Sequence, residues 1–259
     1  MGGRLDRAEL RRRAIEGVRE EVEAFGTGGV ESRLIRRDGL LAAVTPASPQ
    51  RSLFNSVFYT DTAVLAAEVD ALTEAYDSAG VRAWTVFVPD SDRESAALLE
   101  SRGHLLDAAP RAMALDLADL GPEPPQPEGI EHGTGDAATA ALLNDLAYGY
   151  GADGFRAGLG SSETSIRWDA AYEGEEQVSC VGAIRVGDDC LITGVATPPE
   201  QRRRGIAGWL VWKVLDNARA AGLRSGSLQA TKAGAPLYER MGFADLGFLE
   251  MWELRRSGP

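Results

Sequence analysis

The stretch that joins a strand to a helix, and from which the fold can be inferred, reads Val195-Ala196-Thr197-Pro198-Pro199-Glu200-Gln201-Arg202-Arg203-Arg204-Gly205-Ile206-Ala207-Gly208. A run of strand-forming residues ends at its first three positions, and the two prolines that follow cannot continue a central strand. Apolar residues then recur at helical spacing from Ile206 to Ala218, so a helix begins close to Gly205. The stretch therefore predicts a strand, a tight turn and a helix N-terminus.

This predicted helix N-terminus is suited to binding an anion. The first N–H groups of a helix have no partner within the helix, and the helix dipole adds partial positive charge there. Gly205, Ala207 and Gly208 carry little or no side chain, so an anion can approach their backbone closely. The segment has the properties of a site for pyrophosphate.

Two motifs in this part of the chain resemble those of the GNAT N-acetyltransferase superfamily. Arg202-x-x-Gly205-x-Ala207 resembles the R/Q-x-x-G-x-G/A loop that binds the pyrophosphate of acetyl-coenzyme A. Leu237-Tyr238-Glu239-Arg240-Met241-Gly242-Phe243 resembles the L-Y-x-x-x-G-F motif of the family, and it follows at the expected distance. The resemblance implies an α/β fold with two tandem GNAT-like domains, each a mixed, mostly antiparallel sheet flanked by helices.

The resemblance also implies which residues hold acetyl-CoA. The strand end would pair its backbone with the pantetheine arm, and an N–H group near Val195 or Ala196 would stabilise charge on the thioester oxygen. One arginine of the 202–204 run would reach a phosphate, while the others are solvated charge. The residues expected to bind the cofactor are Val195, Ala196, Thr197, Arg202, Arg203, Arg204, Gly205, Ile206, Ala207, Gly208 and Thr231. In the family the position of Thr231 is often asparagine.

Tyr238 is the candidate catalytic residue. In families of this kind the amine attacks the thioester directly, and the departing thiolate needs a proton. A phenol with a reference pKa near 10 keeps its proton at neutral pH and can give it to a thiolate, whose thiol has a pKa near 8.5. The alternative is a structural tyrosine that packs under the cofactor.

No general base can be selected from the sequence. Some family members carry a glutamate close to the position of Leu191, and Asp188 and Asp189 are expected to be turn residues of a hairpin. Asp153, Glu173 and Glu250 are other carboxylates that could face an acceptor. A water relay, or an amine that is already partly deprotonated, is equally allowed.

Composition excludes several classes of protein. The chain has 259 residues, of which 44% are hydrophobic and 25% charged, which is typical of one large or two medium globular domains. A formal charge of −12 argues against binding to nucleic acid or to an anionic membrane, and it would attract a cationic amine. The charged N-terminus and the lack of a membrane-length apolar run lead us to expect a cytoplasmic protein. We expect it to be a monomer or a homodimer.

The two cysteines are expected to be free. A turn at Gly187–Asp189 would pair Val186 with Cys190, which places Cys180 far from Cys190 along the hairpin. Buried thiols in a reducing compartment are therefore expected instead of a disulfide. Neither cysteine has the spacing of a metal ligand, and the two histidines of the chain are isolated, so no metal site is expected.

Two short echoes indicate an internal duplication. Ser78–Arg82 resembles Ala220–Arg224, and Leu98–His104 resembles Leu237–Phe243, in the same order along each half. The first half lacks the glycines and the arginine of the cofactor loop. We expect a degenerate GNAT-like domain over residues 1–118, a proline-rich linker over 119–128 and a catalytic domain over 129–259.

Periodicity and turn residues place the remaining elements. Helices are expected at Leu5–Phe25, Asp61–Ala79, Arg93–Arg102, Asp136–Tyr148, Glu163–Tyr172, Gly205–Ala221 and Ala233–Met241. Strands are expected at Ser32–Arg36, Leu40–Thr45, Leu53–Tyr59, Ala83–Val88, near Ile130, at Val178–Val186, Cys190–Thr197 and Ser225–Ala230, and as a final pair within Phe243–Leu254. By resemblance, Tyr148–Ser162 is a loop on the acceptor side.

The predicted function is transfer of an acetyl group from acetyl-CoA to a primary amine, by an N-acetyltransferase in which only the second half is active. The acceptor is expected to be a small molecule. Two alternatives are a non-catalytic acyl-CoA-binding or regulatory module, in which Tyr238 is structural, and a transferase of a longer acyl group.

Overall fold

The computed structural model describes residues 3–151, 154–159 and 164–256, and the chain divides into two compact units. Each unit is assembled from segments that are far apart in the sequence. Unit 1 contains Met1–Gly17, Arg111–Gly151 and Ser165–Gly247, and unit 2 contains Val18–Pro110, Ala152–Thr164 and Phe248–Pro259. Helix α1 (Arg7–Gly28) and strand β12 (Ala244–Arg255) each begin in unit 1 and end in unit 2.

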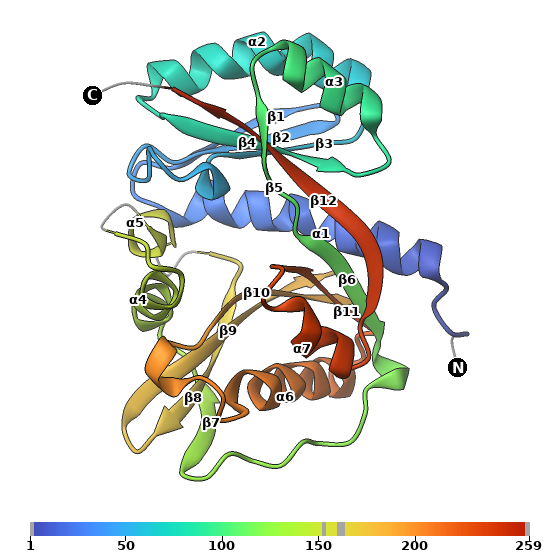
Figure 1. Ribbon diagram of the computed structural model, residues 1–259, viewed down its shortest axis with the longest axis vertical. Helices are drawn as coiled ribbons and strands as arrows, with labels where there is room; N and C mark the ends of the chain where they lie inside the picture. The colour runs from blue at the N-terminus through green and yellow to red at the C-terminus, as the bar shows by residue number, and fades with distance from the viewer. Residues whose placement is uncertain (1–2, 152–153, 160–163, 257–259) are drawn as a thin grey trace. The chain divides into compact units, whose positions relative to one another are not determined.

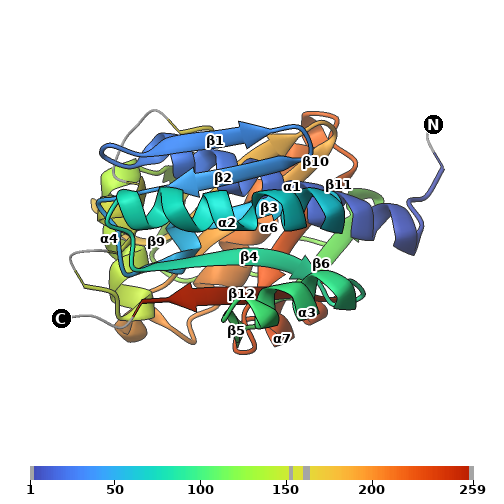
Figure 2. The same ribbon diagram turned by 90° about the horizontal axis from the view of Figure 1, so that it is seen from above.

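Unit 2 is a sheet with two helices on one face (Figure 1, Figure 2). The strand order is β1 (Arg33–Arg37), β2 (Leu40–Val44), β3 (Ser56–Tyr59), β4 (Ala83–Pro89) and β12, with β5 (Leu105–Ala108) also paired to β12. Helices α2 (Thr62–Ser78) and α3 (Arg93–Ser101) bury apolar side chains against Val57 and Val86. A short helix, α5 (Phe155–Leu159), also belongs to this unit.

Unit 1 is a sheet covered by helices on both faces. Its strand order is β7 (Ile130–Thr134), β8 (Arg167–Glu173), β9 (Glu176–Val186), β10 (Asp189–Ala196), β11 (Ser225–Ala230) and β6 (Arg111–Asp116), with β12 beside β6. Helix α6 (Ile206–Ala220) packs on the face that carries Val181 and Ile192. Helix α4 (Ala137–Tyr148) packs on the other face, over Cys180, and a short helix α7 (Ala235–Arg240) follows β11.

The two units repeat one arrangement, which confirms the duplication inferred from the sequence. In unit 2 the order is β3–α2–β4–α3, and in unit 1 it is β10–α6–β11–α7. The two strands on either side of the first helix are parallel neighbours in both units, β3 with β4 and β10 with β11. The pairs β1/β2, β2/β3, β4/β12, β5/β12, β6/β11, β7/β8, β8/β9 and β9/β10 are antiparallel, so each sheet is mixed and mostly antiparallel, as predicted.

The strand that completes each repeat comes from the opposite half of the chain. Strand β6, from the end of the first half, pairs antiparallel with β11, while β12, the last strand of the chain, pairs antiparallel with β4. The compact units therefore differ from the contiguous ranges 1–118 and 129–259 that the sequence predicts. The sequence pattern could not reveal this, because either strand has the same alternating pattern whichever sheet it joins. Between Asp119 and Ile130 there is no helix or strand, as expected of a linker.

Three expected elements are corrected by the structure. The predicted helix Glu163–Tyr172 is wrong: Glu163 lies outside the described residues, and Arg167–Glu173 is strand β8, which pairs with β7 and β9 because pairing on both edges outweighs the helix propensity of its alanines. The final strand pair is one long strand, β12. In the hairpin, Val186 pairs with Asp189 and not with Cys190.

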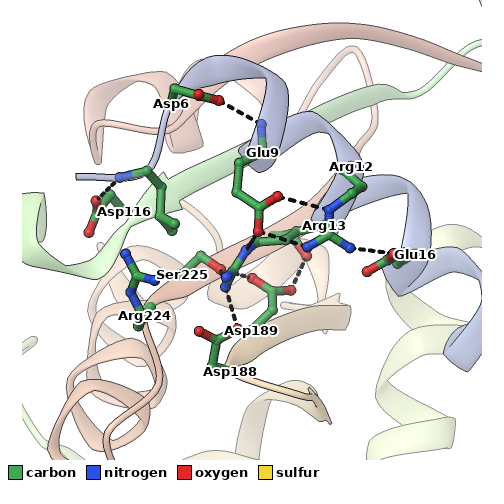
Figure 3. Close-up of polar contacts among 12 residues, drawn as sticks. Asp6, Glu9, Arg12, Arg13, Glu16, Asp116, Asp188, Asp189, Arg224 and Ser225 are labelled. Atoms are coloured by element: carbon green, nitrogen blue, oxygen red, sulfur yellow. Dashed lines mark hydrogen bonds and ion pairs between the residues drawn. The ribbon is translucent and has the colours of Figure 1, made fainter. Parts of the chain in front are cut away.

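A buried charge network attaches the first part of α1 to the sheet of unit 1 (Figure 3). Arg13, 7% exposed, pairs with Glu9 and with Asp188, both at 2.7 Å, and donates to the Ser225 hydroxyl at 3.0 Å. Asp189, 1% exposed, accepts hydrogen bonds from Ser225 and Ser227. Burial raises the pKa of Asp189. Residues 7–17 are therefore part of the same unit as β10 and β11.

Replacing Arg13 tests this attachment. Arg13→Leu removes the buried cation that pairs with Asp188 and acts electrostatically on the buried Asp189, so we expect the free energy of unfolding to fall by about 3 kcal/mol or more. Arg12 is the matched control, because it lies on the same helix and pairs with Glu9 and Glu16 at the surface, where a pair contributes less than about 1 kcal/mol. Equal losses in the two variants, measured by urea denaturation, would contradict this account.

A second buried group, His104 in unit 2, gives a prediction for pH. Its side chain is fully buried edge-on to Trp84, and neither ring nitrogen has a hydrogen-bond partner among the described residues. Burial lowers the pKa of His104 from 6.5 to about 4. The folded state therefore stays neutral while the unfolded state takes up a proton, and stability is lost as the pH falls from 6.5 toward 4.

The loss attributable to His104 over that range is about 3 kcal/mol. His104→Phe keeps the ring against Trp84 and removes the titrating group, so its stability should fall less steeply over the same pH range than that of the wild type. Denaturant titrations of both proteins at pH 7, 5.5 and 4.5 measure the difference. Parallel pH profiles would show that His104 does not titrate as described.

Candidate functional site

Strands β10 and β11 separate before they end. They pair in parallel only from Asp189/Ser225 to Ile192/Leu228, after which β10 continues along β9 and β11 continues along β6. A bulge lies between Thr193 and Ala196 on β10. We call the diverging region, 193–196 on β10 with 229–230 on β11, the splay. In the described part of the chain, no strand pairs with the facing edges of β10 and β11 in the splay, and binding of a ligand by Val195 to Thr197 stays a prediction.

Three successive carbonyl groups in the splay bond to three different elements. The Gly194 carbonyl accepts from Asn144 Nδ2 on α4 at 3.1 Å, the Val195 carbonyl accepts from the Tyr148 hydroxyl at 3.0 Å, and the Ala196 carbonyl accepts from Ser179 on β9 at 2.9 Å. Gly194 has a φ of 54°, and a Cβ there would lie 2.6 Å from the Trp168 ring. The bulge therefore requires glycine and is held on both sides.

Helix α6, which follows the splay, has a bare N-terminus, meaning that no side chain among the described residues caps it, unlike the other long helices. The first turn of each of α1, α2, α3 and α4 is capped by an aspartate that accepts from a backbone N–H group: Asp6, Asp61, Asp92 and Asp136. At α6 the N-cap residue is Gly205, and no side chain among the described residues caps the helix. An anion at this position would supply the missing acceptor.

The backbone of the loop presents several unpaired N–H groups in succession. Within the described part of the chain, the N–H groups of residues 203–208 donate no hydrogen bond, whereas the next one, from Trp209, bonds to the Gly205 carbonyl at 3.1 Å. Arg203 and Gly205 both have positive φ, 64° and 81°. Left-handed residues alternating with others turn successive N–H groups toward one concavity, which binds anions. The positive φ at Arg203 is an unfavourable conformation for a residue with a side chain.

The three arginines of the loop have different surroundings. Arg202 donates to the carbonyls of Thr197 and Ala147, and Arg204 pairs with Glu173 at 2.7 Å. Both are thus engaged by other parts of unit 1. Arg203 is exposed and has no ion pair among the described residues. Of the three, Arg203 is the cation available to a ligand phosphate.

The second motif contacts the first. A Cβ at Gly208 would lie 3.2 Å from Leu237 Cδ1, so the glycine lets α7 approach the first turn of α6. Tyr238, 7% exposed, belongs to the same apolar cluster as Val195. Burial, and then the neighbouring Tyr148, raise the pKa of Tyr238, so its hydroxyl is protonated at neutral pH. The Tyr148 hydroxyl therefore lies in the splay, at Val195, and acts electrostatically on Tyr238.

Thr231 follows β11 and caps the turn that leads into α7. Its hydroxyl accepts from the N–H of Gly234 at 3.1 Å, and its side chain is exposed. Trp209 and Trp212 on α6 are buried in the apolar cluster, as expected of packing residues. The assignment of Thr231 to cofactor binding stays a prediction.

The carboxylates considered as a base are engaged elsewhere. The prediction that Asp189 is a turn residue is wrong, since it is buried on β10, at the opposite end of the strand from the bulge, while Asp188 remains in the turn and pairs with Arg13. Glu173 pairs with Arg204, and Glu250, in unit 2, pairs with Arg93. Asp153 lies outside the described residues.

In unit 2, the start of α2 after β3 corresponds to the start of α6 after β10, and side chains occupy it. The Asp61 carboxylate accepts from the N–H of Ala63 at the start of α2, where α6 has none. Tyr59, at the end of β3, donates to Asp92 at 2.6 Å, and Asp92 also caps α3. Leu99 stands where unit 1 has Tyr238. The Asp61 carboxylate at the N-terminus of α2 would repel a phosphate. This agrees with the sequence, in which the first half lacks the glycines and the arginine of the cofactor loop.

The sequence also bears on the cysteines, possible metal ligands and possible membrane helices. Both cysteines are free and buried, as predicted, and burial raises the pKa of each thiol to about 12. No group of three or more His, Cys, Asp or Glu residues able to hold a metal ion occurs in residues 3–151, 154–159 and 164–256. Over the same residues, no helix has the length and apolar character that crossing a membrane requires. Part of the expected acceptor loop, residues 152–153 and 160–162, lies outside the described residues.

Comparison with known proteins identifies the fold of this region. Residues 167–245 match the family model of the acetyltransferase (GNAT) domain, and this range includes the splay, the bare N-terminus of α6 and both motifs. No curated protein matches the chain. The recognition of a GNAT domain from the two motifs is thereby confirmed.

Solved structures extend the likeness to the whole chain. A GCN5-related N-acetyltransferase from Kribbella flavida aligns with a TM-score of 0.66 at 15% identity, over 96% of each chain. One from Sphaerobacter thermophilus aligns with a TM-score of 0.62 at 18% identity, over 99% of this chain and 96% of that one. A tandem GNAT protein from the clavulanic acid biosynthesis pathway aligns with a TM-score of 0.57 at 13% identity, over 97% and 96%. At these identities the likeness shows a shared fold.

Filling the bare N-terminus of α6 should weaken anion binding. A Cβ at Gly205 meets nothing within 4 Å, and Asp and Asn tolerate a left-handed backbone better than other residues with side chains, so both can be introduced. Gly205→Asp adds a carboxylate cap, and Gly205→Asn adds the same shape without charge. We expect Gly205→Asp to bind acetyl-CoA at least about 10-fold more weakly than Gly205→Asn. Calorimetric titration measures this, and equal affinities would mean that no phosphate lies there.

Proposed function

We propose, from the GNAT acetyltransferase domain at residues 167–245, that this protein transfers an acetyl group from acetyl-CoA directly to a primary amine, and that the acceptor is a small molecule. Under this proposal, acetyl-CoA binds to unit 1 only. The observation that carries the proposal is the run of N–H groups at 203–208 that donate no hydrogen bond among the described residues, a few residues after the end of β10, where β11 no longer pairs with it. That combination suits a ligand with a pyrophosphate at one end and an amide-containing arm at the other.

Different backbone groups of the chain would bind the pyrophosphate, the pantetheine arm and the thioester of acetyl-CoA. The N–H groups of Arg203 to Gly208 would hold the pyrophosphate, with the Arg203 guanidinium as the nearby cation. The backbone of Val195 to Thr197 would pair with the amides of the pantetheine arm, as a neighbouring strand would. Fixed donors of this kind need no reorganisation during the reaction, so an N–H group at the bulge would also stabilise charge on the thioester oxygen.

Acetyl-CoA supplies an activated thioester, and the chain must supply a proton to the leaving sulfur. Tyr238 is the proposed donor, because it is protonated at neutral pH and lies in the apolar cluster with Val195. Its raised pKa makes the phenol a weaker acid than in water. A thiolate that leaves within the same desolvated site is correspondingly more basic, so the transfer is not opposed by burial alone.

Deprotonation of the amine is assigned to no carboxylate among Glu173, Asp188, Asp189 and Glu250, since each has the partners described above. The amine would then enter in its neutral form or lose its proton to water. The formal charge of −12 favours the approach of a cationic amine to the protein.

Tyr238→Phe separates catalysis from binding. Loss of the hydroxyl should lower kcat by about 10²-fold or more, the usual range for acid catalysis, while the affinity for acetyl-CoA stays the same. The measurements are thiol release with a panel of primary amines and calorimetric titration with acetyl-CoA. Unchanged kcat would remove Tyr238 from the mechanism.

The same two measurements distinguish the main alternative. A protein that binds acetyl-CoA but releases no thiol with any amine of a broad panel would be a non-catalytic acyl-CoA-binding module. A protein that binds no acetyl-CoA would contradict the proposed function as a whole.

A further inference from the structure

We propose that Tyr148 is a latch that occupies the acyl-donor site, and that the pantetheine arm must displace its hydroxyl from Val195 to bind. This inference rests on the proposed function, because it assumes that the arm pairs with the backbone of β10. It assigns Tyr148 to control of donor binding, whereas the sequence indicates only an aromatic residue at the start of an acceptor-side loop.

The geometry at Val195 carries the proposal. The carbonyls on either side of Val195 are held by permanent parts of the fold, Gly194 by the fully buried Asn144 and Ala196 by the fully buried Ser179. The Val195 carbonyl is the one between them, in the splay, and its partner is the Tyr148 hydroxyl at 3.0 Å. Beyond Ile192, no residue of β11 pairs with β10. An arm that paired with β10 as a strand would need this same carbonyl as an acceptor.

Tyr148 has the properties of a displaceable group. It is the last residue of α4, its side chain is 43% exposed, and Gly149 ends the helix with a φ of 70°. Its ring lies near that of Tyr150, with centroids 6.0 Å apart and an angle of 26° between the planes. Because Tyr148 is exposed, the exchange of its hydrogen bond to Val195 for one from a ligand has a small cost.

The end of α4 is retained when the latch opens. Arg202 bridges the Ala147 carbonyl, at 2.8 Å, and the Thr197 carbonyl, at 3.0 Å, so it links α4 to the end of β10 independently of Tyr148. Release of Tyr148 would therefore move one side chain and not the helix. Burial, and then the electrostatic influence of Tyr148, raise the pKa of Tyr238, so displacement of the Tyr148 hydroxyl would also change the electrostatic surroundings of the proposed acid.

Tyr148→Phe gives a prediction that a purely structural role does not. With the competing hydroxyl removed, the affinity for acetyl-CoA should rise by about 3- to 10-fold, the range that one neutral hydrogen bond supports. A structural role predicts weaker binding, because the end of α4 would be less well held. Adenosine 3′,5′-bisphosphate, which has the phosphates nearest the nucleoside but no pantetheine arm, should bind the variant and the wild type equally.

Tyr172→Phe is the matched control. The Tyr172 hydroxyl also donates to a backbone carbonyl in unit 1, that of Thr134 at 2.8 Å, but this carbonyl lies outside the splay. Calorimetric titration of the three proteins with both ligands should show a gain only for Tyr148→Phe with acetyl-CoA. Unchanged or weaker binding in that variant, or an equal gain with the bisphosphate, would overturn the latch and leave the proposed function standing. If wild-type protein binds no acetyl-CoA, both are overturned.

Discussion

Unpaired backbone N–H groups at the start of α6 are the constraint on which the site depends. The aspartates at the other long helices show how the chain ordinarily meets this constraint, with a carboxylate placed at the first turn. At α6 the chain has a glycine instead, preceded by three arginines, of which Arg203 is held at positive φ. A buried or half-buried donor without an acceptor costs free energy, and so does a left-handed arginine. We propose that an anionic ligand takes up these N–H groups and so offsets both costs.

The exchange of strands explains how a half without the cofactor loop still contributes to unit 1. The sheet that carries the splay is continued beyond β11 by β6, and the face opposite α6 is partly covered by residues 7–17 of α1, held there through Arg13. Both segments belong to the first half of the sequence. Deleting that half would therefore remove a strand and a helix from unit 1. The proposed catalytic unit is thus not separable at the proline-rich linker, even though the motifs all lie after it.

Local patterns in the sequence predicted the parts of the site that are local. The loop at 202–208, the helix after it, Ser225–Ala230 and the caps at Asp61 and Asp136 follow from turn chemistry and periodicity, and the structure has them. Pairings between distant segments were not predictable in this way. The helix expected at Glu163–Tyr172 is a strand because of its two neighbours, Asp189 is buried because two serines and Arg13 surround it, and β6 and β12 join sheets that their own sequences do not specify. The bond from Tyr148 to Val195 likewise depends on where α4 ends.

Hydrogen exchange at the start of α6 tests the central claim most directly. The N–H groups of residues 203–208 have no acceptor among the described residues, whereas the corresponding turn of α2 is capped by Asp61. Peptide-resolved exchange with and without saturating acetyl-CoA compares the two helix starts in one experiment. The account predicts that acetyl-CoA slows exchange at 203–208 and leaves 61–65 unchanged. Binding of acetyl-CoA without any slowing at 203–208 would contradict it.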